Sequence, residues 1–186
     1  MRLEHLGKSL AETVYKERIV VDFPEDELKP LWTILKAMDQ GKYECLGLFD
    51  GDAMVGYTFL VKLGKDYLVD YLAVYPDKRN SGAGGVMVNL LAEYLRDADN
   101  IIVEVENPEY AENEDQKELQ SRRLAFYYRN GCADTGLRVK TFGVPFLILR
   151  MGESSCNDLD ALWELYQSFY REVLPKEMFE KSVKRQ

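Results

Sequence analysis

Three glycines within four residues, Gly82, Gly84 and Gly85, precede a segment with helical apolar spacing. The whole stretch, residues 76–85, reads PDKRNSGAGG. The first amides of a helix lack intrahelical acceptors and lie at the positive end of its dipole, so they bind phosphate groups. Glycine permits a positive φ and removes the Cβ that would keep a ligand away from the backbone. This stretch therefore predicts a phosphate-binding loop.

Two common nucleotide-binding motifs do not match this loop. A P-loop requires a lysine after its last glycine, and the chain has Val86 and Met87 there. A dinucleotide-binding loop requires a third glycine, at the position of Met87, and a direct strand-to-helix turn. Glu104 is spaced as the ribose-binding acid would be, but the preceding segments are joined by hairpin-like turns. The alternative without a binding function is a flexible, glycine-rich helix start that holds no ligand.

The elements before the loop follow from periodicity and turn residues. Residues 8–18 predict a short helix, and residues 22–41 predict a second one, opened by Pro24 and acidic residues and ended by Gly41. Its apolar residues at helical spacing are Leu28, Leu31, Trp32, Leu35 and Met38. Hairpin-like punctuation then predicts three antiparallel strands, at 43–49, 53–63 and 67–74.

The elements after the loop alternate between helix and strand. Apolar pairs recur every four residues over 86–95, which predicts an amphipathic helix. A strand at 101–106, a helix ended by Gly131, further strands and a helix from residue 158 follow. The expected fold class is α/β with a mixed sheet, in which an antiparallel meander is followed by helix, strand, helix and strands, with an extra C-terminal helix.

One motif and its flanks resemble a known family. Arg79-Asn80-Ser81-Gly82-Ala83-Gly84 satisfies the pattern [RQ]xxGx[GA], and the segments YLAV, IIVEVE and FYYRNGCADTG lie at the expected distances from it. Over residues 20–150 the sequence resembles the GNAT superfamily of acyl-CoA-dependent N-acyltransferases. The resemblance implies a GNAT fold, with an acetyltransferase domain at 1–150 and a helical extension at 151–186 packed on the same domain.

The resemblance also implies the cofactor and its contacts. Acetyl-CoA would be the co-substrate, and no metal would take part. The backbone of Leu72, Ala73 and Val74 would pair with the pantetheine arm. The pyrophosphate would be bound by the amides of Arg79, Asn80, Ser81, Gly82, Ala83, Gly84 and Gly85. Asn107 matches a position that often contacts the arm, although Asn107-Pro108 is equally typical of the start of a turn.

Amide transfer requires that the amine lose a proton and that the leaving thiolate gain one. The family motif often uses a tyrosine four residues before a glycine for the thiolate, which here is Tyr127 before Gly131. A phenol with a pKa of about 10 holds its proton at neutral pH. The alternative is that Tyr127 only packs in the core.

Three acids are candidates for the base. Asp70 precedes Leu72 by two residues, so strand alternation predicts that it shares a face with Leu72 and Val74. Glu104 and Glu106 alternate with valines and so share one face of their strand. The alternative is that these acids face solvent or pair with Arg122 or Arg123.

Composition narrows the class of protein. The net charge of −8 and pI of about 4.9 argue against binding to nucleic acid or anionic membranes. We expect a cytoplasmic protein, because no signal-like or spanning segment is visible and the three cysteines, Cys45, Cys132 and Cys156, are widely spaced. The single histidine, His5, leaves no triad or zinc motif.

The leading hypothesis is an N-acetyltransferase that transfers the acetyl group of acetyl-CoA to a primary amine by direct attack in a ternary complex. The acceptor would be a small-molecule amine or a protein or peptide amine, and the chain a monomer or homodimer. The alternative is a non-catalytic acyl-CoA-binding sensor or scaffold of the same fold.

Overall fold

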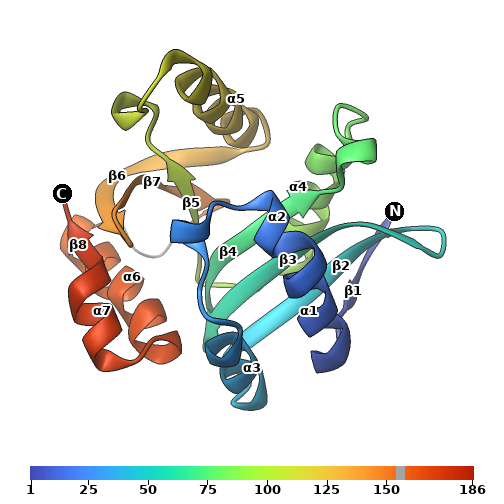
Figure 1. The fold of residues 1–186 in the computed structure, drawn as a ribbon, viewed down its shortest axis with the longest axis horizontal. Helices are drawn as coiled ribbons and strands as arrows, with labels where there is room; N and C mark the ends of the chain where they lie inside the picture. Colours follow the sequence, from blue (N-terminus) through green and yellow to red (C-terminus); the bar gives the residue numbers. More distant parts are fainter. Residues whose placement is uncertain (154–157) are drawn as a thin grey trace. The chain divides into compact units, whose positions relative to one another are not determined.

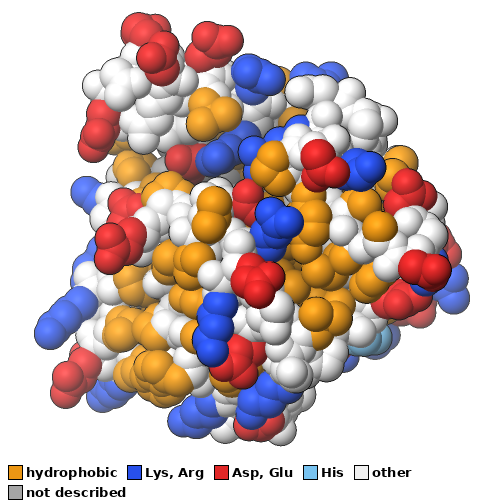
Figure 2. Space-filling model, turned by 45° about the vertical axis from the view of Figure 1, so that its right-hand side comes forward, with side chains coloured by type: hydrophobic (Ala, Val, Ile, Leu, Met, Phe, Trp, Pro, Cys, Tyr) orange, Lys and Arg blue, Asp and Glu red, His pale blue; other side chains and the backbone are white. Residues whose placement is uncertain are grey.

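The computed structural model describes residues 1–153 and 158–186. These residues form two compact units, residues 1–98 and residues 99–186. Cys156 lies outside the described residues, whereas Cys45 and Cys132 are buried free thiols. Among the helices of the described ranges, none is long and apolar enough to cross a membrane. Acidic and basic side chains are interspersed over the face drawn in Figure 2.

The first unit is an antiparallel sheet with strand order β1-β2-β3-β4. In chain order it contains β1 (Arg2–His5), α1 (Lys8–Val14), the π-helical turn η1 (Tyr15–Ile19), α2 (Val20–Asp22), the 3-10 turn η2 (Glu25–Glu27), α3 (Leu31–Asp39), β2 (Tyr43–Asp50), β3 (Ala53–Leu63), β4 (Asp66–Val74), the 3-10 turn η3 (Pro76–Lys78) and α4 (Ala83–Tyr94) (Figure 1). The predicted meander is confirmed, with strand boundaries shifted by at most one residue.

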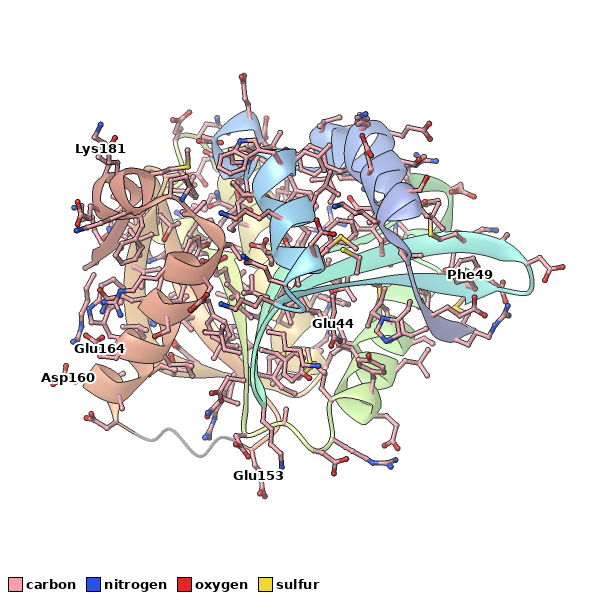
Figure 3. All side chains as sticks on the ribbon, turned by 90° about the horizontal axis from the view of Figure 1, so that it is seen from below. Glu44, Phe49, Glu153, Asp160, Glu164 and Lys181 are labelled. Carbon is pink, nitrogen blue, oxygen red and sulfur yellow. The ribbon has the colours of Figure 1, made fainter. Side chains whose placement is uncertain are left out.

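Helices cover both faces of this sheet. Figure 3 shows α1 and α3 on one side of it and α4 on the other. On the first side, the Cys45 sulfur of β2 lies 3.8 Å from the Met38 sulfur of α3. On the other side, Leu48 of β2 packs against Met87 of α4, and Glu44, labelled in Figure 3, accepts a hydrogen bond from the far end of α4.

The second predicted helix begins later than expected. It starts at Leu31 instead of near Pro24, and Glu25–Glu27 form a separate 3-10 turn. Pro30 is the N-cap of α3, and the residue before a proline is disfavoured in helical conformation, so the helix starts after Pro30. Trp32, one of the apolar residues at helical spacing, does not pack inward. Trp32 is 56% exposed, because the side of α3 that packs inward carries Thr33, Ile34 and Ala37.

The first helix is longer than predicted, and one strand was missed. The helix predicted at 8–18 continues to Asp22 through a π-helical turn. The N-terminal residues form β1, in which Leu3 is the register partner of Leu48. Four residues are too few for periodicity to reveal a strand, so β1 depends on pairing with β2.

The second unit is also antiparallel, with strand order β5-β7-β6-β8. It contains β5 (Asn100–Glu106), the 3-10 turn η4 (Pro108–Tyr110), α5 (Glu114–Arg129), β6 (Cys132–Thr141), β7 (Val144–Met151), α6 (Leu159–Val173), α7 (Lys176–Ser182) and β8 (Val183–Arg185). The predicted end of α5 is confirmed by Gly131, which has a φ of +85°. The short β8, which pairs with β6, was not predicted. The division between 1–150 and 151–186 stays a prediction.

Candidate functional site

The glycine loop of the first unit has the backbone conformation of an anion cradle. Asn80 and Gly82 both have a positive φ, 61° and 88°. Gly82 is the N-cap of α4, and its carbonyl accepts from the Val86 amide at 3.1 Å. The amides of residues 83–85 precede the first intrahelical hydrogen bond of α4, so they have no acceptor within the helix. They lie at the positive end of the helix dipole, which attracts anions. The left-handed Gly82 directly precedes the helical residue Ala83, and such an alternation turns successive amides toward one side, as in anion-binding nests.

The side chain of Arg79 is used to hold this loop. Its Nε donates to the Val74 carbonyl at 3.0 Å, and its terminal nitrogen donates to Asp22 at 2.8 Å. Within the loop, the Ser81 hydroxyl donates to the Lys78 carbonyl at 2.6 Å. The arginine of the motif therefore links the loop to the end of β4 and to α2.

The backbone of β4 next to the loop has polar groups that point away from β3. The Tyr75 amide donates to the Val55 carbonyl of β3. Along an antiparallel ladder, every second residue of a strand forms hydrogen bonds to the same neighbouring strand, and the residues in between face the other way. Ala73, the partner of Tyr57, is therefore bonded to β3, whereas the amides and carbonyls of Leu72 and Val74 face the opposite edge. Two of the three residues predicted to meet the cofactor arm thus present backbone groups away from β3.

Asp70 lies on a different face from the one predicted. Phe59 pairs with Tyr71 and Leu60 pairs with Val69, so Asp70 is the extra residue of a β-bulge. A bulge places two successive side chains on one side of the strand. The side chain of Asp70 therefore lies on the α3 side of the sheet, whereas Leu72 and Val74 pack near α4.

The carboxylate of Asp70 is buried and paired. It forms an ion pair with Lys29, and the side chains of Lys29 and Asp70 are only 3% and 1% exposed. It also accepts a hydrogen bond from the Tyr43 hydroxyl. Burial and the charge of Asp70 raise the pKa of Tyr43 well above its usual value, so this phenol remains a donor. Neither partner of Asp70 is among the arginines considered from the sequence.

Glu104, in the second unit, is held by two tyrosines of the C-terminal helix α6. The Tyr170 hydroxyl lies 2.7 and 2.9 Å from its two carboxylate oxygens, and the Tyr166 hydroxyl also donates to it. Tyr166 in addition shares a hydrogen bond with Thr141 at 2.6 Å. Sequence reasoning did not find these partners, because the two tyrosines lie more than sixty residues beyond Glu104.

Glu106 and Tyr127 share a neighbour in Arg123 of α5. Arg123 forms an ion pair with Glu106, whose other oxygen accepts from the Gln120 amide at 3.1 Å. Burial raises the pKa of Tyr127, with a further rise from Cys132 and an opposing effect from Arg123. The neighbouring Tyr128 is exposed, as helical geometry predicts. The amide oxygen of Gln120, a residue not singled out in the sequence, is buried without a hydrogen-bond partner.

Comparison with known proteins identifies the fold. The structure matches a GNAT-family acetyltransferase of Bacteroides thetaiotaomicron with a TM-score of 0.72 and 22% identity, covering 94% of this chain and 100% of that one. The chain has the GNAT acetyltransferase fold. The ribosomal-protein-S18-alanine N-acetyltransferase of Escherichia coli also shares the GNAT fold, with a TM-score of 0.59 and 19% identity over 83% of this chain and 94% of that chain.

A third protein of GNAT fold carries the expected ligand. A Bacillus subtilis acetyltransferase in complex with CoA matches with a TM-score of 0.53 and 16% identity, over 82% of this chain and 98% of that one. No family model matches the sequence, and no curated protein does. The resemblance drawn from the loop and its flanks is therefore confirmed at the level of the fold.

The surroundings of one further predicted residue, Asn107, are visible locally. Asn107 is 4% exposed, and its side-chain oxygen accepts from the Glu109 amide at 3.1 Å, which starts the turn η4. Asn107 thus starts a turn, as one of the two alternatives predicted. A contact between Asn107 and a cofactor stays a prediction. Among the described residues, no cluster of three or more His, Cys, Asp or Glu side chains could hold a metal ion.

Proposed function

We propose that this protein is an N-acetyltransferase that transfers the acetyl group of acetyl-CoA to a primary amine. The observation that carries the proposal is the loop at residues 76–85, with left-handed residues at Asn80 and Gly82 and the start of α4 behind them, in a chain of GNAT fold. This backbone suits the pyrophosphate of CoA. The cofactor-binding residues proposed from the sequence are kept: Leu72, Ala73, Val74, Arg79, Asn80, Ser81, Gly82, Ala83, Gly84, Gly85 and Asn107.

In the proposed reaction, the acceptor amine attacks the thioester carbonyl directly within a ternary complex. The C–N bond forms, the C–S bond breaks, and the thiolate leaves. The Tyr127 hydroxyl gives its proton to the thiolate, since its raised pKa keeps it protonated. The proton of the amine goes to one of the three carboxylates, Asp70, Glu104 or Glu106.

Isothermal titration calorimetry with CoA, acetyl-CoA and ATP tests the cofactor. We expect both CoA forms to bind and ATP to bind much more weakly, because ATP lacks the pantetheine arm. Binding of ATP without binding of CoA would show the proposal to be wrong. A screen of acetyl-CoA against amines, read as release of free CoA thiol, then tests turnover and identifies the acceptor class.

The change Tyr127→Phe is expected to lower kcat by about 100-fold, at the low end of typical contributions from general acids. The affinity for CoA should stay the same, since the ring is retained. Because the pKa of Tyr127 is raised, its proton is not lost as the pH rises through 10, so wild-type turnover should show no fall near pH 10 due to this group. Tyr128→Phe, at an exposed neighbouring position, is the control. Equal turnover in the two variants would remove Tyr127 from the mechanism.

One observation favours a second candidate function, a CoA-binding sensor or scaffold without turnover. Each of the three candidate bases is already engaged, Asp70 by Lys29, Glu104 by tyrosines of α6 and Glu106 by Arg123. The carboxylate oxygens of these residues already accept hydrogen bonds, which leaves fewer lone pairs to receive a proton from an amine. CoA binding without turnover of any amine in the screen would support this candidate.

A further inference from the structure

The end of the first helix is joined to the glycine loop by a chain of three side chains. Asp22, the last residue of α2, accepts from Arg79 at 2.8 Å with one oxygen and from Tyr57 at 2.9 Å with the other. The side chain of Asp22 is 7% exposed, and Tyr57 of β3 is fully buried. Burial and the nearby Asp22 raise the pKa of Tyr57, so it remains a donor to this carboxylate.

This arrangement gives Arg79 two fixed attachment points. Its Nε is bound to the Val74 carbonyl at the end of β4, and its terminal nitrogen is bound to Asp22. Asp22 is in turn oriented by Tyr57, a fully buried residue of β3. The planar guanidinium can bridge such points, because its donors lie in a fixed fork.

A second contact joins the same two segments. The Arg18 guanidinium lies over the Tyr75 ring, 4.1 Å from its centre. Arg18 belongs to the π-helical turn η1, and Tyr75 directly precedes the turn η3 that opens the loop. π-Helical turns are rare and occur frequently at functional sites. Two residues of the helix at 8–22 therefore hold the loop, one at each end of η3.

We propose that Asp22 is a positioning residue for cofactor binding, which acts through Arg79 to hold the loop 76–82 in its anion-binding conformation. This inference rests on the proposed binding of CoA at the loop. A loop that is ordered before binding does not lose the entropy of becoming ordered on binding. Asp22 itself donates no group to the ligand and carries a negative charge, so its effect is indirect.

The sign of the effect separates positioning from simple electrostatics. If Asp22 acted only through its charge, its removal would leave Arg79 unpaired and would strengthen the binding of the negative pyrophosphate. If Asp22 positions the loop, its removal should weaken binding by about tenfold, which corresponds to ordering one or two side chains. The two mechanisms thus predict opposite changes in the same dissociation constant.

The experiment measures the dissociation constant of CoA by calorimetry for the wild type, Asp22→Ala, Arg79→Ala and the double variant. We expect Asp22→Ala to weaken binding by about tenfold, and to have less than a twofold effect once Arg79 is already alanine, because coupled residues are not additive. The milder Asp22→Asn should weaken binding less and provides a folded variant if alanine is not tolerated. With acetyl-CoA and an acceptor, KM for acetyl-CoA should rise while kcat is unchanged.

Tyr57→Phe is the matched control for stability. It removes the other hydrogen bond of the same carboxylate but leaves the pair between Asp22 and Arg79. We expect a lower free energy of unfolding in urea, and a smaller loss of affinity for CoA than in Asp22→Ala, because Asp22 still binds Arg79. An Asp22→Ala variant that binds CoA as tightly as the wild type, or more tightly, would overturn the positioning role alone. A wild type that does not bind CoA would instead refute the proposed function.

Discussion

Gly84→Asp is expected to abolish the binding of CoA while leaving the protein as stable as the wild type or more so. Gly84 is the second residue of α4, and the new carboxylate would lie at the proposed pyrophosphate position. Two unit charges about 4 Å apart repel by ~4 kcal/mol at an effective dielectric constant of about 20. The dissociation constant of CoA should therefore rise by about a thousandfold.

The stability of the Gly84→Asp variant should change in the opposite direction. An acidic residue in the first turn of a helix is favourable by about 0.3–1 kcal/mol, and replacing a helical glycine removes part of its entropic cost. Gly82 is less suitable for this test, since its φ of 88° would strain any other residue. Calorimetry with CoA and thermal unfolding together measure the two effects.

Asn89→Asp is the matched control for Gly84→Asp. It adds the same charge to an exposed position further along α4. We expect it to change the affinity for CoA by less than about threefold, because it is exposed and lies about 7.5 Å further from the helix start, where salt screens much of its charge. Tight CoA binding by Gly84→Asp would contradict the assignment of the pyrophosphate to the start of α4.

Lys29→Met is expected to destabilise the first unit by about 3–5 kcal/mol. The lysine and Asp70 are buried together, so its loss leaves a carboxylate uncompensated in the interior. The free energy of unfolding, measured in urea, should fall accordingly. The double variant Lys29→Met/Asp70→Leu should regain most of this stability, because replacing both members of a buried pair with apolar residues is often neutral.

The same double variant tests whether Asp70 takes part in the chemistry. Asp70 already interacts with Lys29 and Tyr43, so we expect turnover to recover together with stability. A double variant that is stable but has lost more than about a hundredfold in kcat would identify Asp70 as the base. If stability does not recover, the ion pair is not the main reason for the fall in the single variant.

The glycine loop and the order of elements could be predicted because they depend on neighbouring residues. The pattern from Arg79 to Gly84 and the apolar pairs of α4 lie within one short segment, and the hairpin turns of the meander are equally local. Helical and strand periods are properties of consecutive residues, so they are visible in the sequence. The GNAT fold, which the resemblance of this motif and its flanks to the family implied, is confirmed.

The chemical environment of the candidate acids could not be predicted, because it depends on distant residues. Asp70 pairs with Lys29, 41 residues earlier, and Glu104 with Tyr170, 66 residues later. The bulge that changes the face of Asp70 arises from pairing between two strands.

The sequence by itself predicted a phosphate-binding loop at residues 76–85 and gave the residue types in that loop. Only the tertiary structure decided which carboxylates are buried and paired, and that Asp22 holds Arg79, 57 residues further along the chain. The physical reason is that hydrogen bonds and burial are set by contacts in space, whereas a local sequence pattern specifies only the conformation of its own segment.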